Sequence, residues 1–273
     1  MKRLHFALTC LAFFALFAIF AGCASNRGKD RPRQPKGPVK KTAALSSEDA
    51  YRIAGLFESV AAFRNPSDGK TKLAVGTRAG YLHLMDFNVG GLRLEWQSPY
   101  LGGPVRGVQV KDFQGNGVSE IMVYTGGGRL IMMEMEGYSV ARENAAFDMS
   151  EIDCAVAIQL DDDPALEILA CGGDRFAVYD GATLFKEWEA PGTIPGEWLA
   201  VGDVDGDGML EVVLNSGYVL DAKFFRIKTQ LGRLGERIEL MDVDGDGVDE
   251  ILAEDEDGGI AVYDARMPGI PEF

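Results

Sequence analysis

Two stretches of the sequence concentrate carboxylates at a regular spacing. They read DVDGDGMLE from Asp203 and DVDGDGVDE from Asp242, with acidic residues at positions 1, 3, 5 and 9 of each. Carboxylates packed this closely repel one another unless a cation lies between them. Glycines at positions 4 and 6 allow the tight backbone path that would turn these side chains toward one centre.

The chemistry that fits this arrangement is calcium (Ca²⁺) binding by oxygen ligands. Calcium takes six or more hard oxygens in a flexible geometry, whereas magnesium keeps more water and requires stricter octahedral placement. The backbone carbonyl at position 7 would add one ligand to the side chains of each loop. The predicted ligands are Asp203, Asp205, Asp207, Met209 and Glu211 in the first loop and Asp242, Asp244, Asp246, Val248 and Glu250 in the second.

Three other stretches are altered copies of the same loop. The copy formed by Asp112, Gln114, Asn116 and Glu120 keeps an oxygen at each position but only two charges, so weak metal binding and a hydrogen-bonded turn are both open. The copy DDDPALE, from Asp161, is two residues shorter and contains Pro164, and no site is predicted there. In a further copy Lys72 replaces the glutamate, and its ammonium would exclude calcium.

The five copies belong to a repeat whose elements would position the loops. Each has an apolar strand, an acidic loop, a second apolar strand, a glycine-rich turn and an alternating strand. The residues before the second strand are Lys72, Glu120, Glu167, Glu211 and Glu250, at spacings of 48, 47, 44 and 39 residues. Repeats of this length with several strands each predict an all-β fold, a β-propeller of about five four-stranded blades.

The two complete loops resemble the DxDGDGxxE calcium loops of FG-GAP and VCBS repeats, as found in the propeller heads of integrin α-subunits. The resemblance covers most of the chain after the N-terminal region and is strongest from Val201 to Tyr263. It implies a propeller in which calcium has a structural role, because each set of ligands comes from one short segment at the rim.

The N-terminal residues 1–22 are predicted to be a lipoprotein signal peptide. Lys2 and Arg3 precede an almost wholly apolar run, and the sequence IFAGC ends it at Cys23. This ending resembles the bacterial lipobox, in which the cysteine receives the lipid (palmitate among its acyl chains). An ordinary signal peptide with a chance cysteine is the alternative. By the same resemblance, Ala24 favours sorting to the outer membrane of the cell envelope.

Residues 23–47 are predicted to be a lipidated cysteine followed by a disordered, proline-rich tether, and residues 48–273 the propeller. The tether carries seven Lys or Arg and one Asp, which leaves about −23 on the propeller from a whole-chain charge of −15. Such an acidic domain argues against nucleic acid as a partner. The basic tether fits either contact with anionic lipid or a simple spacer role.

Few residues suggest catalysis. His83 is the one histidine beyond the predicted signal peptide, it lies in a strand pattern, and no nucleophile elbow or phosphate loop is present. Cys154 and Cys171 fall on two strands expected to pair, so that a disulfide and two buried thiols are both open. Trp96, Trp188 and Trp198 are candidates for an aromatic ligand platform, with packing as the alternative.

These features predict a non-catalytic binding or scaffolding module for a protein or glycan at the cell envelope, held to the membrane by its lipid. A subunit of an outer-membrane assembly complex and an enzyme acting on polysaccharide are the alternatives.

Overall fold

The computed structural model describes residues 57–88, 91–146, 148–254 and 259–266. The chain divides into two units, Met1–Lys41 and Thr42–Phe273, and every described residue belongs to the second. The predicted signal peptide, Cys23 and the tether lie outside the described residues. No helix in the described part of the chain is long and apolar enough to cross a membrane.

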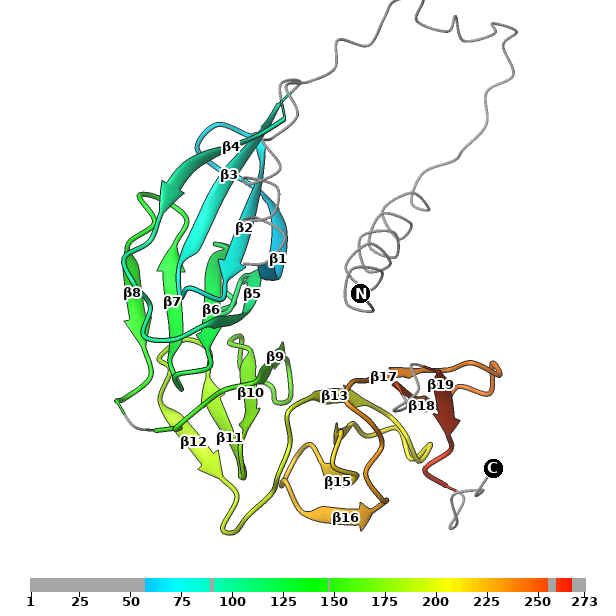
Figure 1. Ribbon diagram of the computed structural model, residues 1–273. Helices are drawn as coiled ribbons and strands as arrows, with labels where there is room; N and C mark the ends of the chain where they lie inside the picture. Colours follow the sequence, from blue (N-terminus) through cyan, green and yellow to red (C-terminus); the bar gives the residue numbers. More distant parts are fainter. Residues whose placement is uncertain (1–56, 89–90, 147, 255–258, 267–273) are drawn as a thin grey trace, which may run out of the picture. The chain divides into compact units, whose positions relative to one another are not determined.

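The described residues form strands and their connections (Figure 1). In chain order the strands are β1 (Phe57–Arg64), β2 (Thr71–Thr77), β3 (Leu82–Asn88), β4 (Gly91–Gln97), β5 (Val105–Lys111), β6 (Glu120–Thr125), β7 (Leu130–Glu134), β8 (Val140–Glu143), β9 (Cys154–Ile158), β10 (Glu167–Gly172), β11 (Arg175–Asp180), β12 (Lys186–Glu189), β13 (Leu199–Gly202), β14 (Glu211–Leu214), β15 (Tyr218–Asp221), β16 (Ile227–Gln230), β17 (Ile238–Met241), β18 (Glu250–Glu254) and β19 (Ile260–Tyr263).

The strands form five antiparallel sheets, each made of consecutive strands, which we number blades 1 to 5 in chain order. Blades 1 to 4 have four strands, and blade 5 has three among the described residues. Sequential up-and-down sheets of this size are the units of a β-propeller. The predicted all-β fold with about five blades is confirmed, as is the repeat on which that prediction rested.

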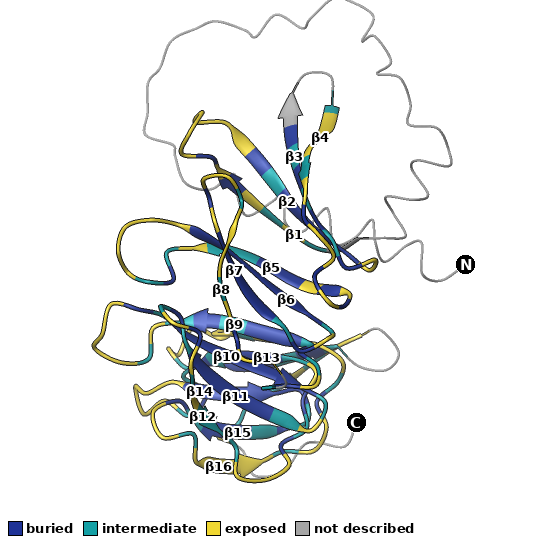
Figure 2. Cartoon of the chain, turned by 90° about the vertical axis from the view of Figure 1, so that its left-hand side faces the viewer, coloured by how far each residue is buried: buried dark blue, intermediate teal, exposed yellow. Residues whose placement is uncertain are grey.

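Burial follows strand position within each blade (Figure 2). The second strands β6, β10 and β14 are buried along their whole length, whereas every residue of the fourth strand β16 is exposed. A strand covered by neighbouring sheets on both faces is apolar throughout, which explains sequences such as EIMVYT and EILACG.

Four apolar clusters fill the spaces between consecutive blades. The cluster between blades 1 and 2 includes Leu84 and Ile131, and the one between blades 2 and 3 includes Met132 and Ile168. The cluster between blades 3 and 4 includes Phe176 and Val212, and the one between blades 4 and 5 includes Val213 and Ile251. In the part of the chain that the structure describes, no such cluster joins blade 5 to blade 1. Packing between blades therefore supplies the core, since an isolated sheet of this size leaves both faces exposed to water.

The fourth strand of blades 1 to 4 has a register shift at the same place. One extra residue enters the pairing of the third and fourth strands, and in blades 1, 3 and 4 it is Glu95, Glu187 and Lys228. A bulge re-aims the inserted side chain.

Candidate metal-binding loops

The two complete acidic loops connect the first and second strands of blades 4 and 5. Their final glutamates, Glu211 and Glu250, are the first residues of β14 and β18 and are buried, with Glu211 0% exposed. The glutamate sits at the base of the loop because the second strand lies between neighbouring blades. The aspartates remain in the more exposed part of the loop.

Within the loop of blade 4, backbone amides hold the aspartates. Asp203 accepts hydrogen bonds from the amides of Gly206 and Gly208 at 2.7 and 2.9 Å, and both glycines have positive φ, of 78° and 81°. Glu211 accepts a bond of 3.1 Å from the amide of Val204. Carboxylate oxygens of Asp203, Asp205 and Glu211 all lie within 4.8 Å of one another. The structure thus gathers three of the four predicted side-chain ligands.

The loop of blade 5 repeats this arrangement. Asp242 accepts bonds of 2.6 and 3.0 Å from the amides of Gly245 and Gly247. Here the oxygens that lie within 4.8 Å of one another belong to Asp242, Asp244 and Asp246. In both loops these acidic groups could hold a metal ion.

The position 7 residues contact the loops through their amides. Met209 donates to Asp207 at 2.8 Å, and Val248 donates to Asp246 at 2.9 Å. Ligation of calcium by their carbonyl groups stays a prediction.

A basic side chain closes the blade 4 loop. The Lys228 ammonium pairs with Asp205, with Asp207 at 3.1 Å and with Glu211 Oε1 at 2.9 Å. Burial opposes its charge, but hydrogen bonds to these three carboxylates outweigh that effect and raise the pKa of Lys228. Lys228 is the extra residue of the β16 bulge, so the bulge directs this cation into the loop.

Blades 5 and 2 have comparable cations. Arg266 lies 2.7 Å from Asp246 and 3.6 Å from Glu250. In blade 2, Arg142 binds both oxygens of Glu120, at 2.5 and 2.7 Å. Each glutamate at the start of the second strand in these blades therefore has a cation from its own blade.

The altered loop of blade 2 is a hydrogen-bonded turn. Asp112 accepts from the amides of Asn116 and Gly117 at 3.1 and 2.6 Å, and Gln114 donates to Glu120 at 3.0 Å. The complete loops have the same kind of amide bonds, so weak metal binding by Asp112, Gln114, Asn116 and Glu120 stays a prediction. The bidentate pair with Arg142 already compensates the charge of Glu120.

Blade 1 has the same pair with the charges exchanged. Lys72, only 2% exposed, donates to Glu95 at 2.5 Å and lies 3.4 Å from Asp68. Glu95 is the extra residue of the β4 bulge, the position that Lys228 takes in blade 4. The ammonium of Lys72 thus stands where the other blades place a glutamate.

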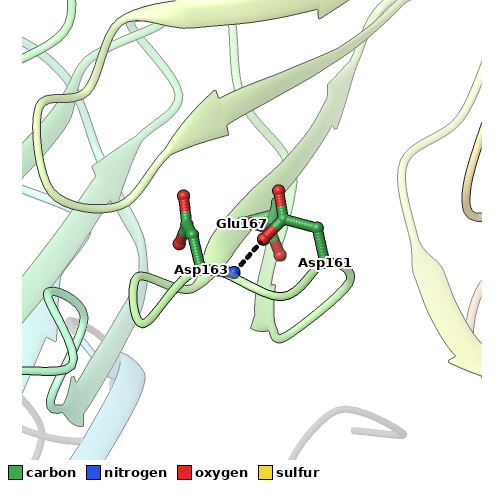
Figure 3. A group of neighbouring side chains, drawn as sticks. All are labelled: Asp161, Asp163 and Glu167. Carbon is green, nitrogen blue, oxygen red and sulfur yellow. Dashed lines mark hydrogen bonds between the residues drawn. The ribbon is translucent and has the colours of Figure 1, made fainter.

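The shortened loop of blade 3 departs from the prediction. No site was expected there, yet oxygens of Asp161, Asp163 and Glu167 lie within 4.8 Å of one another (Figure 3). Two bonds shape the loop, from the Asp163 amide to Asp161 at 2.8 Å and from the Leu160 amide to Glu167 at 2.6 Å. The alternating acids before the strand were the signal that could have revealed this group, despite Pro164.

Blade 3 also lacks the compensating cation. None of the three acids forms an ion pair within the described ranges, and the bulge position of β12 carries Glu187. Burial, followed by the charges of Asp180, Asp161 and Asp163, raises the pKa of Glu187. Blade 3 therefore has the least compensated acidic group among the described loops.

The acidic loops of neighbouring blades lie side by side. The Leu166 amide donates to the Phe113 carbonyl at 2.9 Å, and the Asp249 amide donates to the Asp203 carbonyl at 2.8 Å. The turn between the third and fourth strands lies at the same end of a blade, as a 2.9 Å bond from Ala222 to Leu210 shows. We call the loops 112–119, 161–166, 203–210 and 242–249, with the turns 135–139, 181–185 and 222–226, the acidic end.

The three tryptophans pack between structural elements. The ring centroids of Trp96 and Tyr138 are 5.4 Å apart, those of Trp188 and Phe225 are 5.0 Å apart, and the Arg237 guanidinium lies 5.2 Å from the Trp198 ring. All three are half-buried. These contacts favour packing, and the aromatic platform stays a prediction.

The remaining candidates have structural surroundings. Cys154 and Cys171 lie directly opposite each other on β9 and β10, but both are free, buried thiols, so the disulfide is not formed. His83 pairs with Gln97 on the neighbouring strand, and burial lowers its pKa. Neither the strand pairing of His83 nor its lowered pKa places a nucleophile beside this histidine.

Comparisons with known proteins concern the fold. No family model and no curated protein matches the chain, so the FG-GAP and VCBS resemblance stays a prediction. A chain in the crystal structure of BBS1N in complex with ARL6DN is similar with a TM-score of 0.56 and 11% identity, over 77% of this chain and 65% of that one. The V. cholerae biofilm matrix protein Bap1 gives a TM-score of 0.51 and 17% identity, over 72% and 35%. This chain thus spans less than two thirds of either structure, and at these identities the likeness supports the β-propeller fold alone.

Proposed function

We propose that this protein is a non-catalytic binding or scaffolding module of the bacterial cell envelope. In this proposal, lipid at Cys23 anchors it to the membrane, calcium stabilises the acidic loops, and the acidic end binds a protein or glycan partner. The observation that carries the binding role is the exposure of large apolar side chains at the acidic end.

These apolar residues lie on connections of neighbouring blades. Phe185 is 76% exposed on the turn of blade 3, Val118 is 58% exposed on the loop of blade 2, and Met209 is exposed on the loop of blade 4. Large exposed apolar residues that gather on one surface are typical of interaction sites. The strands beneath them are buried, so the connections are displayed on a rigid support.

Calcium fits the donor set of the loops. Each group offers three carboxylates within 4.8 Å, and oxygen-only sets with several charges suit calcium. The ligands would be Asp203, Asp205, Asp207 and Glu211 in blade 4 and Asp242, Asp244, Asp246 and Glu250 in blade 5. The ion would stabilise the folded loops, and Lys228 and Arg266 would have to give up part of their contacts to admit it.

The binding role is tested by site-specific crosslinking in intact cells. A photoreactive amino acid at Phe185 or Val118 should capture a discrete partner. The same amino acid at Asp174, which is exposed on the turn between β10 and β11 at the opposite end of blade 3, is the matched control. Equal products from all three positions, or turnover of a glycan by the purified protein, would contradict the proposal.

A further inference from the structure

We propose that the turn between β15 and β16 and the first residue of β16, together Lys223 to Ile227 and called the hairpin below, dock onto the anionic headgroups of the membrane that carries the protein. This inference rests on the proposed anchor, because the predicted tether would keep the hairpin within reach of a membrane. It adds a second membrane contact, made by the folded domain itself.

The hairpin is held in one conformation that turns Phe224 outward. Asp221 accepts bonds from the amides of Phe224 and Arg226, at 2.6 and 3.1 Å. Phe225 has a φ of 53°, and its ring packs on Trp188 of blade 3. Because Phe225 points into the domain, its neighbour Phe224 is left 57% exposed.

Two cations flank the exposed ring. Lys223 Nζ lies 5.6 Å and Arg226 Cζ 5.3 Å from the centroid of Phe224. Both residues are exposed, and neither forms an ion pair among the described residues. In a chain with 42 acidic and 27 basic residues, this turn offers a local surface of the opposite charge.

The corresponding hairpin of blade 3 shows that the backbone does not require these residues. Its Asp180 accepts a 2.6 Å bond from the Thr183 amide, and Leu184 has a φ of 59°. Position for position, Ala182 and Thr183 stand where blade 4 has Lys223 and Phe224. The turn of blade 3 therefore forms without the two cations, although it has an exposed ring of its own, Phe185, at the position of Arg226. The cations beside an exposed ring are the addition in blade 4.

The combination of charge and apolar surface favours a lipid headgroup layer over a soluble polyanion. Cations alone would suit any polyanion. Phe224 and Ile227, the latter 53% exposed, would in addition bury apolar surface at the boundary between headgroups and acyl chains, which strengthens binding to a membrane. Lys and Arg beside an apolar residue place their charges at the phosphates. The acids of the adjacent loop, Asp205 and Asp207, already pair with Lys228.

The reach of the tether is compatible with this contact. About 24 residues separate Cys23 from the start of the predicted propeller, and a flexible coil of that length spans roughly 25–30 Å. A domain anchored in this way would be close enough to the membrane for even a weak contact to have a high effective concentration.

The test uses tryptophan fluorescence in vesicles of brominated lipid. Full chain carrying Phe224→Trp or Asp174→Trp is purified in detergent and reconstituted with brominated phosphatidylglycerol or phosphatidylcholine. The signal of the added tryptophan is taken as the difference from the parent, whose Trp96, Trp188 and Trp198 also fluoresce. We expect bromine to quench this signal at position 224 on phosphatidylglycerol only, and to leave it unquenched at position 174 on both lipids. Adding Lys223→Glu and Arg226→Glu should abolish the quenching at 224 while the protein still sediments with the vesicles.

Three results would overturn the proposal. They are no quenching at 224 on phosphatidylglycerol vesicles, equal quenching on both lipids, and loss of quenching when soluble alginate is added at constant ionic strength. Protein that stays in the supernatant of phosphatidylcholine vesicles contradicts the anchor instead. The quenching on phosphatidylglycerol still decides the role of the hairpin in that case.

Discussion

The ammonium nitrogen of Lys228 lies 2.9 Å from Oε1 of Glu211, a carboxylate that is completely buried. The two residues are on the fourth and second strands of blade 4, and the β16 bulge brings them together. Blade 1 has Lys72 and Glu95 at the same two positions with the charges exchanged. The acidic loops of blades 2, 4 and 5 are therefore part of a charge arrangement inside the blade, and in blades 4 and 5 the proposed metal ion would compete with a basic side chain for the same oxygens.

Calcium should stabilise the folded protein through the two complete loops. Binding to the folded state alone adds about 2.7 kcal/mol for each site at a hundred times its dissociation constant. The melting temperature should fall with chelator and recover more with calcium than with equimolar magnesium. The double substitution Asp205→Ala and Asp244→Ala should remove most of this response. A melt of metal-free protein that calcium does not change would contradict the calcium proposal.

Replacing Lys228 should separate its effect on stability from its effect on calcium affinity. Lys228→Met leaves Glu211 buried without a charged partner, which should cost about 1–3 kcal/mol in urea denaturation without calcium. The same variant should bind calcium more tightly, because no ammonium competes for Asp205, Asp207 and Glu211. Lys223→Met, at an exposed position of the adjacent hairpin, is the matched control and should change neither quantity. Unchanged calcium affinity in Lys228→Met would argue against competition.

Trp188 should prove to be a packing residue. Trp188→Ala removes contacts with Phe176 and Phe225 and should lower the free energy of unfolding by about 3 kcal/mol. Trp188→Phe should recover part of this loss. A stable Trp188→Ala variant that fails to capture its partner in crosslinking would instead support the aromatic platform.

Glu189 should make the stability of the protein depend on pH under acidic conditions. Burial opposes its ionisation, but hydrogen bonds from Lys186 and Arg175 prevail and lower its pKa below the ordinary 4.5. The carboxylate of Glu189 therefore binds a proton less readily in the folded state than in the unfolded state. The contribution of Glu189 to the free energy of unfolding is complete above about pH 4.5 and is lost as the pH falls through the lowered pKa. Glu189→Gln should be less stable than the parent at neutral pH, and the difference should shrink on acidification. A difference that stays constant from pH 7 to pH 3 would contradict this assignment, and Glu197→Gln, at an exposed position, is the control.

The anchor is tested by changing Cys23 to serine. Cys23→Ser removes the thiol that would receive the lipid, so an uncleaved or mislocalised precursor is expected in cell fractionation. A variant that matures and fractionates as the parent does would show that Cys23 is not the lipid site.

The sequence by itself determined the repeat and the loops. Lys72, Glu120, Glu167, Glu211 and Glu250 mark the second strand of every blade, and glycines at fixed positions produce the turns with positive φ. These features depend on residues close together in the chain, where strand alternation and turn geometry act directly. For that reason the blade number and the main acidic groups could be read from the sequence.

Only the tertiary structure decided which partners those groups have. Lys228 lies 17 residues from Glu211 and reaches it because a bulge shifts the register of β16. The acids of the blade 3 loop meet despite its shorter length, and Trp188 packs on a residue of the next blade. Such contacts depend on strand register and on packing between sheets, and a one-residue shift in register would turn each side chain to the other face.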